Sequence, residues 1–251
     1  MDDLSLFRNR MCELSNLAWQ NSRYYFSDFL SEADLDEFLR MEKTLSPAGF
    51  AISGGRENAG RVMIRFGSEE AFGYTEDFPI TYIKVEPILE KFSDDLTHRD
   101  FLGALMNLGI ERDVLGDLLI EGHTCWIICK DTISSYICEN LGQIRHTHVK
   151  CTPADTIPAG LGTKTINEEK QVASERIDAV VSAFSGLSRS ETAELFRSKK
   201  VFLNSRCTEN NAQLLHAGDC ISARGFGKMR YLGASGQTRK GRLKISYERF
   251  V

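Results

Sequence analysis

The stretch from Ile80 to Cys151 constrains the fold most, because its apolar segments follow one another in a regular order of two lengths. Short segments typical of strands alternate with longer segments typical of helices. The predicted elements are strand 80–85, helix 98–108, strand 117–120, strand 125–129, helix 133–141 and strand 144–151. A β-α-β-β-α-β order of this kind predicts the split βαβ arrangement of ferredoxin-like folds.

Many RNA-recognition domains share this arrangement, but so do many unrelated proteins. The standard RNA-recognition module displays stacked aromatics on two central strands, in a K/R-G-F-G-F-V-x-F pattern. That pattern does not occur here, and Trp126 is the only aromatic residue on its strand. The stretch is therefore predicted to be ferredoxin-like (RRM-like). Trp126 can be interpreted simply as a core residue.

The N-terminal part predicts a small α/β unit. Its expected elements are an amphipathic helix over Leu4–Tyr25, a helix from Ser31 to about Leu45 with Ser31 and Asp34 as its capping pattern, and strands at Phe50–Ile52 and Arg61–Phe66. The glycine-rich segment 53–60 contains Gly54-Gly55-Arg56-Glu57 but lacks the Gly-Lys-Ser/Thr ending of a nucleotide P-loop. A turn is favoured there over a nucleotide site.

A second informative stretch, Leu187–Asn204, reads LSRSETAELFRSKKVFLN. Ser188 and Glu191 have the spacing of a capping box, which predicts a helix beginning at Arg189. A cation in the first turn opposes the helix dipole, so Arg189 is not explained by helix stability. Free N–H groups, two serines and an arginine are suited to binding phosphate, although a solvated basic helix face is the simpler alternative.

The charges are divided unevenly along the chain. Residues 171–251 contain 14 Lys and Arg against 7 Asp and Glu, a net of +7, whereas residues 1–170 contain 17 against 28, a net of −11. A basic C-terminal part suits a phosphate-backbone partner, and the acidic remainder argues against indiscriminate binding along nucleic acid.

The segments around the Leu187–Asn204 stretch complete the C-terminal prediction. Thr152–Lys164 is rich in Pro, Gly and Thr and is expected to be a linker. A helix capped by Ser174 should follow, with Ile177, Val180, Val181 and Phe184 as its buried face and Arg176 projecting on the other side. Beyond the strands expected at 201–204 and 220–224, a glycine-rich tail carries basic residues and is expected to be mobile.

These segments resemble two known families. The ordered set R-I-D at 176–178, L-S-R-S at 187–190, V-F-L-N at 201–204 and G-D-C-I at 218–221 resembles the RNA-binding domain named after small-subunit ribosomal protein S-four. The tail segments R-G-F-G-K at 224–228 and G-Q-T-R-K-G-R at 236–242, with H-R-D-F-L-G-A-L at 98–105 and V-L-G-D at 114–117, resemble the YlmH family of bacterial RNA-binding proteins.

The resemblance implies binding to ribosomal RNA or tRNA on the large ribosomal subunit, and a nucleic-acid role for the middle domain. Relatives bearing the S-four-type module act in rescue and quality control of stalled large subunits, and YlmH genes have also been associated with cell division. His98 and Arg99 are candidate phosphate contacts, with a capping or surface role at least as well supported. Asp178 is expected to fix a neighbouring arginine.

Metal and disulfide chemistry are not expected. The seven cysteines are an odd number, which argues against a disulfide framework, and we interpret them as reduced and mostly buried. Cys125 and Cys129 would lie roughly 13 Å apart on a strand, too far to ligate one zinc ion. His146 and His148 share a predicted strand face, but no further ligand pair accompanies them.

Catalysis is not expected either, although many proteins with an S-four-type module are enzymes. The chain lacks a G-x-G-x-x-G turn between strand and helix, a G-x-S-x-G elbow and an H-E-x-x-H helix. No cofactor or small-molecule substrate is therefore predicted. No apolar run approaches the ~20 residues of a membrane span, and the acidic start Met1-Asp2-Asp3 is unlike a signal peptide, so a cytoplasmic protein without a membrane partner is expected.

The sequence thus predicts an α+β protein with domains at 1–75 (α/β), 76–152 (ferredoxin-like), a linker at 153–172 and an S-four-type domain with a basic tail at 173–251. The expected function is non-catalytic binding of structured rRNA or tRNA in translation or ribosome-associated quality control. An RNA-modifying enzyme, such as a pseudouridine synthase or methyltransferase, and a cell-division adaptor are the alternatives. The predicted RNA-binding residues are Arg176, Ser188, Arg189, Ser190, Arg197, Lys199, Lys200, Asn204, Arg224, Lys228, Arg230, Arg239, Lys240 and Arg242.

Overall fold

The computed structural model describes residues 3–162 and 165–250. The chain divides into two compact units, Met1–Leu161 and Gly162–Val251, and each is described by itself. The mixed α+β composition predicted from the sequence is confirmed. Among the predicted features, the first two residues of the acidic start, the linker residues Thr163 and Lys164 and the final residue of the tail lie outside the described residues.

The N-terminal part of the first unit is a small antiparallel sheet with two main helices. Its elements are α1 (Asp3–Asn21), β1 (Tyr25–Phe26), α2 (Glu32–Arg40), η1 (Glu42–Thr44), β2 (Phe50–Ser53), β3 (Met63–Phe66) and α3 (Glu69–Phe72), with sheet order β1-β3-β2. The Ser31–Asp34 capping box is confirmed at the start of α2. Helix α1 ends earlier than predicted, because Ser22 adopts a left-handed conformation and Tyr25 then pairs with Phe66.

The rest of the first unit has the predicted β-α-β-β-α-β order. Its elements are β4 (Ile80–Pro87), η2 (Glu90–Phe92), α4 (His98–Asn107), η3 (Arg112–Val114), β5 (Leu115–Glu121), β6 (Thr124–Lys130), α5 (Asp131–Asn140), β7 (Gln143–Ile144) and β8 (Thr147–Ala154). The sheet order is β5-β6-β4-β8-β7, so β6 lies between β4 and β5, and β4 lies between β6 and β8. This interleaving is what a split βαβ arrangement requires.

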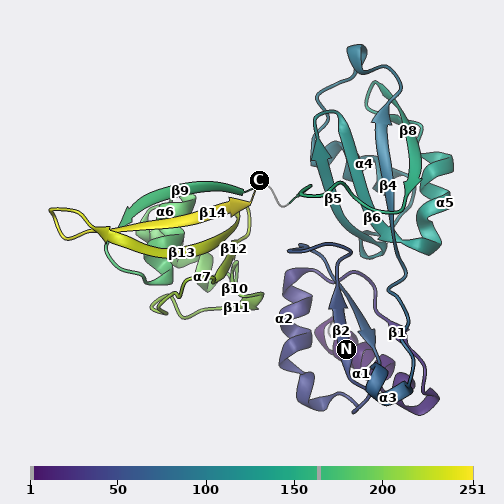
Figure 1. The fold of residues 1–251 in the computed structure, drawn as a ribbon, viewed down its shortest axis with the longest axis horizontal. Helices are drawn as coiled ribbons and strands as arrows, with labels where there is room; N and C mark the ends of the chain where they lie inside the picture. The colour runs from purple at the N-terminus through teal and green to yellow at the C-terminus, as the bar shows by residue number, and fades with distance from the viewer. Residues whose placement is uncertain (1–2, 163–164, 251) are drawn as a thin grey trace. The chain divides into compact units, whose positions relative to one another are not determined.

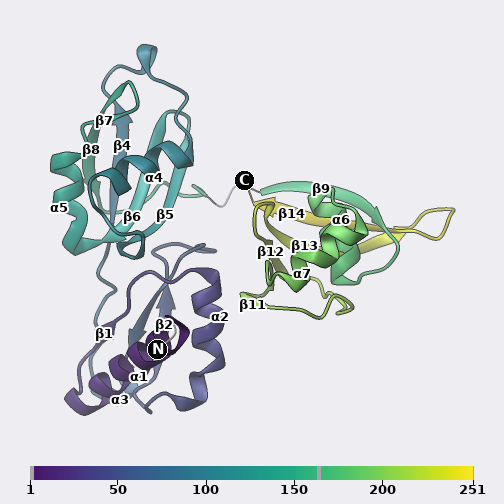
Figure 2. The ribbon, with the colours of Figure 1, turned by 180° about the vertical axis from the view of Figure 1, so that it is seen from behind.

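One face of this sheet is packed against the two helices. Buried apolar side chains of the strands, including Ile83, Val85 and Ile127, form a core with Phe101 and Leu105 of α4 and Ile137 of α5. Figure 2 shows α4 in front of the sheet. The predicted strand 144–151 is interrupted, because Arg145 turns the chain in a left-handed conformation between β7 and β8.

The second unit is one six-stranded sheet with two helices. Its elements are β9 (Thr165–Val172), α6 (Ile177–Ser185), α7 (Arg189–Arg197), β10 (Val201–Leu203), β11 (Arg206–Cys207), β12 (Cys220–Ala223), β13 (Gly227–Gln237) and β14 (Leu243–Phe250). The order is β11-β10-β12-β13-β14-β9. Both helices lie on one face (Figure 2), where the predicted buried stripe Ile177, Val180, Val181 and Phe184 packs into the core.

Two predicted irregular segments are strands in the structure. Residues 165–172, expected to belong to the linker, form β9 because its backbone pairs along the whole length of β14. The tail, expected to be mobile, forms the long hairpin β13–β14 (Figure 1), with register shifts near Gly233 and Gly236. Both glycines have positive φ, so they allow the irregular backbone that the register shifts need.

Helix α6 begins differently from the prediction. Its N-cap is Arg176 rather than Ser174, and no side chain caps it. Instead the N–H groups of Ile177 and Asp178 donate to the carbonyls of Gln213 and Asn211, at 2.8 and 3.3 Å. A neighbouring loop therefore satisfies the free donors of the first turn, and a side-chain cap is not needed.

Among the described residues, none of the helices is both long enough and apolar enough to cross a bilayer. All seven cysteines are free thiols; Cys125 and Cys129 are buried and the other five are half-buried, so the expectation that most are buried was wrong. Burial raises the pKa of the Cys129 thiol to about 12, with smaller contributions from Cys138 and Asp131, which makes this cysteine an inert core residue.

Candidate nucleic-acid interface

The start of α7 is a capping box, as the sequence predicted. Ser188 Oγ accepts a hydrogen bond from the N–H of Glu191 at 3.4 Å, and the Glu191 carboxylate accepts one from the N–H of Ser188 at 2.8 Å. The hydrogen bonds from Ser188 lower the pKa of the Glu191 carboxyl. Arg189 is therefore the first residue of α7, and it is exposed.

Arg189 shares a groove with two other predicted RNA-binding residues. Arg176 at the start of α6, Arg189 at the start of α7 and Arg242 next to β14 line a cavity of about 460 Å³. We call this cavity the arginine groove; its other lining residues are Gln171, Val172, Ala173, Ser174, Asp178, Ala179, Ser182, Ala183, Thr192, Ala193 and Asn211. Three cations from separate elements thus converge on one concave surface.

Asp178 holds Arg176 in this groove, in the role that the sequence predicted. Arg176 Nε and Nη2 donate to the two carboxylate oxygens of Asp178, at 3.1 and 2.7 Å. Asp178 Oδ1 also accepts the N–H of Ala179 at 2.8 Å. Because a bidentate pair fixes the plane of the guanidinium, Arg176 is presented to the groove in a defined orientation.

The two serines that flank Arg189, and the cations at and after the end of α7, do not line the arginine groove. Ser188 Oγ and Ser190 Oγ lie 3.1 Å apart at the exposed helix start. The helical spacing of Arg189, Arg197 and Lys200 predicts one basic face, but helix α7 ends at Arg197, so Lys200 does not share that face. Exposed ion pairs form between Arg197 and Glu194, at 3.4 Å, and between Lys199 and Glu209, at 3.5 Å.

Asn204 is engaged in holding the structure together. Its side-chain amide donates to Asp219 Oδ1 at 2.9 Å, and its Oδ1 accepts the N–H of Cys220 at 2.9 Å. Its φ of 50° lies in the left-handed region, which asparagine tolerates better than most residues. The geometry thus assigns Asn204 to the connection between β10 and β12.

Three of the predicted cations flank aromatic rings. Lys228 Nζ and Arg230 Cζ lie 5.9 and 5.6 Å from the ring centroid of Phe250, and Arg224 Cζ lies 5.4 Å from that of Phe202. Arg230 also forms an ion pair with Glu248 at 3.4 Å. Arg230 and Met229 are neighbours on β13, and Met229 is buried in the core under the helices, so Arg230 points to the opposite face.

The remaining predicted cations, Arg239 and Lys240, lie in the exposed turn between β13 and β14. This turn projects beyond the other strands in Figure 1. Its hydrogen bonds run from the N–H of Thr238 to the Arg242 carbonyl at 2.7 Å, from the N–H of Gly241 to the Thr238 carbonyl at 2.9 Å and from the N–H of Arg242 to Thr238 Oγ1 at 3.0 Å. The turn therefore fixes the backbone of Arg242 at the end of the hairpin.

Two amide side chains that line the arginine groove were missed by the sequence reasoning. Gln171 belongs to β9, which had been interpreted as a linker, and Asn211 belongs to the loop that caps α6. No motif marks either residue. Their contribution comes from chain segments that meet only after the sheet has formed.

In the first unit, the aromatic part of the middle sheet is partly covered. Phe29 and Met63 from the N-terminal part pack with Leu119, Ile128 and Leu161, and Trp126 and Tyr82 pack against this cluster. Trp126 packs against this core cluster but is half-buried, so its interpretation as a core residue is confirmed only in part. Because the rings of Tyr82 and Trp126 are half-buried by packing, this part of the sheet is less open to stacking RNA bases than the aromatic strands of a standard RNA-recognition module.

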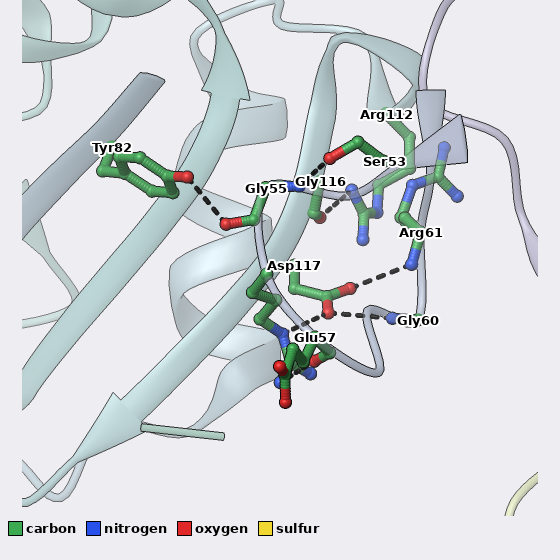
Figure 3. Close-up of polar contacts among 10 residues, drawn as sticks. Ser53, Gly55, Glu57, Gly60, Arg61, Tyr82, Arg112, Gly116 and Asp117 are labelled. Carbon is green, nitrogen blue, oxygen red and sulfur yellow. Dashed lines mark hydrogen bonds and ion pairs between the residues drawn. The ribbon is translucent and has the colours of Figure 1, made fainter. Parts of the chain in front are cut away.

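The glycine-rich turn 53–60 helps to cover that face (Figure 3). Tyr82 donates its hydroxyl to the carbonyl of Gly55 at 2.6 Å. A Cβ at Gly55 would lie 2.9 Å from Ile80 Cγ2, and φ is +75°, so only glycine fits there. The turn is a packing element, in agreement with the prediction that favoured it over a nucleotide site.

Asp117 anchors the same turn to the middle sheet (Figure 3). Its carboxylate accepts hydrogen bonds from Arg56 Nε and the N–H of Gly60, both at 2.9 Å, and from the N–H of Arg61 at 3.1 Å. The side chains of Arg56 and Asp117 are only 11% and 13% exposed. Nearby, burial first and repulsion from Arg61 second lower the pKa of the Arg112 guanidinium to about 10.

Metal ligands do not gather anywhere in the described part of the chain: no group of three or more His, Cys, Asp or Glu residues is placed to hold an ion. His146 lies in the turn before β8, and its N–H donates to Asp94 at 3.1 Å, whereas His148 lies on β8. The two histidines therefore do not share one strand face, as the predicted strand had placed them.

The fold and the groove together describe a mixed α+β chain with a concave basic surface, and comparison with known proteins agrees with the sequence resemblance. Residues 74–157 match the family described as "Putative RNA-binding domain in YlmH". Over 248 residues the chain is 25% identical to "Ribosome-associated protein quality control protein P2" of Bacillus subtilis (strain 168), covering 98% of this chain and 95% of that protein. The predicted resemblance to the YlmH family is confirmed.

A solved structure is also similar. The "Cell division protein ylmH from Streptococcus pneumoniae" shares 20% sequence identity, with 61% of this chain and 92% of that chain covered and a TM-score of 0.48.

Proposed function

We propose that the chain is a non-catalytic RNA-binding protein that grips structured rRNA or tRNA on the large ribosomal subunit, as a factor of translation or ribosome-associated quality control. The observation that carries this proposal is the arginine groove. Arg176, Arg189 and Arg242 reach it from three elements that are far apart in the sequence. Guanidinium groups bind phosphate bidentately, so a concave surface with three of them suits a folded RNA backbone.

Three further findings support the proposal. The groove lies in the basic part of the chain, residues 171–251, with its net charge of +7. A YlmH-type RNA-binding segment occupies residues 74–157. The Bacillus subtilis relative is named as a ribosome-associated quality control protein. Cytoplasmic location follows from this function and is part of the proposal.

The absence of catalysis is proposed on the chemistry of the groove. Its one carboxylate, Asp178, is bound by Arg176 and by the backbone of α6. Both oxygens of this carboxylate already accept hydrogen bonds, so neither is left open to a substrate group in the groove. The groove is therefore suited to binding without a reaction.

Binding of a structured RNA at several salt concentrations tests the proposal. The variant Arg176→Ala/Arg189→Ala/Arg242→Ala should weaken binding on the order of 100-fold and lower the slope of log affinity against log salt by about 3. The control Lys170→Ala/Arg206→Ala/Lys244→Ala removes the same charge from exposed sites outside the groove and should change binding much less. Equal losses in both variants would show that only net charge matters.

Two cellular measurements test the ribosome and the absence of catalysis. Co-sedimentation with the large subunit should be present in low salt and lost after a high-salt wash, and the groove variant should not co-sediment. Mass analysis of rRNA from a strain without the gene should show every modification present. A missing modification would instead establish an RNA-modifying enzyme.

A further inference from the structure

The YlmH-type segment at 74–157 has a sheet whose aromatic residues Tyr82 and Trp126 are half-buried against a cluster that includes Phe29 and Met63 of the N-terminal part. Another surface of the segment carries charged groups that take no part in this packing. The opposite side of the domain carries α4 and α5, and it holds a groove of about 430 Å³.

This second groove lies between α4, the end of α5 and β7. We call it the helix-side groove; it is lined by Arg99, Asp100, Gly103, Ala104, Asn107, Leu108, Asn140, Leu141, Gln143 and Arg145. Two guanidinium groups and three side-chain amides thus surround one concave surface. Among its apolar lining residues Leu141 is buried, whereas Gly103, Ala104 and Leu108 are half-buried, so the groove presents apolar surface together with these polar groups.

Both arginines occupy positions that local stability disfavours. Arg99 is exposed in the first turn of α4, where a cation opposes the helix dipole. Arg145 has a φ of 51°, in the left-handed region where Gly, Asn or Asp is expected. The helix dipole at Arg99 and the backbone conformation at Arg145 both disfavour arginine, so their convergence on one groove supports a binding role.

Asp100 orients Arg145 without using all of its donors. Arg145 Nε lies 2.9 Å from Asp100 Oδ1. The other oxygen of Asp100 accepts the N–H of Thr97 at 2.8 Å and its hydroxyl at 2.7 Å, so the carboxylate belongs to the capping box of α4. Arg145 is thereby tied to a rigid helix start, while its terminal nitrogens stay available for a ligand.

The amides add groups that match a ribose. Asn140 Nδ2 donates to the Tyr136 carbonyl and Gln143 Nε2 to the Arg145 carbonyl, both at 2.8 Å, which leaves their oxygens as acceptors. Asn107 is exposed, and no hydrogen bond to its side chain is seen in the described part of the chain. Phosphate oxygens accept hydrogen bonds from arginine, whereas ribose 2′-hydroxyls can donate to amide oxygens. Arginines beside amides therefore suit the minor groove of double-helical RNA.

We propose that the helix-side groove is a second RNA-binding site, in which Arg99 and Arg145 take backbone phosphates of double-helical RNA and Asn107, Asn140 and Gln143 face its 2′-hydroxyls. This inference rests on the proposed RNA-binding function. It gives the YlmH-type segment a binding surface that avoids its partly covered sheet face.

The test measures binding of the full chain to an RNA hairpin of about 16 base pairs, the span of a shape-reading RNA domain. Arg99→Gln/Arg145→Asn keeps a helix-forming residue and a turn-compatible residue, so the fold should be preserved. We expect roughly tenfold weaker binding and a salt slope reduced by about 2. The control Arg23→Ala/Lys43→Ala removes two exposed charges from the same unit and should bind like the unaltered chain.

A DNA duplex of the same sequence tests the ribose contacts. The unaltered chain should bind it more weakly than the RNA, and Asn107→Ala/Asn140→Ala should reduce that preference. Failure of the two functions is distinguishable: an unaltered chain that does not bind RNA overturns the proposed function. In a second outcome, the unaltered chain binds RNA and the arginine-groove variant does not. If Arg99→Gln/Arg145→Asn then binds as well as Arg23→Ala/Lys43→Ala, only the second site is overturned.

Discussion

Arg176 and Asp178 form a bidentate pair at the start of α6, with distances of 3.1 and 2.7 Å, and both side chains remain partly exposed at 43% and 30%. The carboxylate orients the guanidinium but also places a negative charge in the arginine groove. These two effects on RNA binding have opposite signs.

Asp178→Asn separates the two effects. Asparagine keeps an oxygen that can accept the N–H of Ala179, while the negative charge is lost. We expect binding of a non-specific polyanion to strengthen by roughly two- to fourfold, the size of one partly screened charge. Filter binding with heparin or poly(U), beside Arg176→Ala, measures this. Weakening as large as in Arg176→Ala would show that orientation outweighs charge.

Arg242 should matter more than the two cations of the neighbouring turn. Arg242 lines the arginine groove, whereas Arg239 and Lys240 do not. We expect Arg242→Ala to weaken RNA binding by roughly three- to tenfold and to lower the salt slope by about 1. Arg239→Ala/Lys240→Ala removes twice the charge and should weaken binding less. Fluorescence anisotropy decides the order, and the reverse order would contradict a defined groove.

The sequence predicted the elements near the groove better than the groove itself. The Ser188–Glu191 spacing located the start of α7, and the spacing of Ile177, Val180, Val181 and Phe184 identified the buried face of α6, because both signals are local. The position of Arg242 depends on the register of β13 with β14, which shifts twice. A strand register that depends on irregular pairing cannot be predicted from the spacing of apolar residues in the sequence.

Strand β9 was missed for a related reason. Its sequence, Thr165–Val172, is mostly polar and exposed, with only Val172 buried. Strand patterns are recognised by alternating burial, and an edge strand held by backbone pairing to β14 lacks that alternation. The linker prediction therefore extended too far into the second unit, and Gln171 was lost from the predicted site.

Ser188 should contribute to the stability of the second unit through its cap. Ser188→Ala removes the acceptor for the N–H of Glu191, and we expect the free energy of unfolding to fall by about 1 kcal/mol. Ser190→Ala, two residues later, removes an exposed hydroxyl and should change it by less than about 0.5 kcal/mol. Urea unfolding followed by circular dichroism compares the two. Equal effects would contradict the capping role.

Asp117 should hold the glycine-rich turn against the middle sheet. Asp117→Ala leaves Arg56 and the N–H groups of Gly60 and Arg61 without their acceptor, so we expect a loss of about 3 kcal/mol. In a Trp19→Phe background, Trp126 fluorescence should report the loosening during urea unfolding. Asp95→Ala removes an exposed carboxylate and serves as the control. Equal stability of the two variants would contradict this anchoring.

Tyr247 and Glu168 should make the second unit sensitive to alkaline pH. Tyr247 is fully buried and donates its hydroxyl to Glu168 Oε2 at 2.7 Å. Burial first, and the hydrogen bond to Glu168 second, raise the pKa of the Tyr247 phenol from 10.0 to about 12. A raised folded-state pKa stabilises the protonated form. The stabilisation is therefore complete below pH 10 and is lost as the pH rises towards 12.

The contact between Tyr247 and Glu168 should also make the second unit less stable in acid. The hydrogen bond from Tyr247, followed by that from Arg249, lowers the pKa of the Glu168 carboxyl from 4.5, so its stabilisation is present above that pH and lost below it. In Tyr247→Phe, absorbance at 295 nm should show one fewer tyrosine with a raised pKa. The fall in unfolding free energy between pH 10 and 12 should also become smaller, by on the order of 2 kcal/mol. Tyr136→Phe, at an exposed site of the first unit, is the control. An unchanged alkaline profile in Tyr247→Phe would show that the phenol titrates normally and that the contact with Glu168 does not couple it to folding.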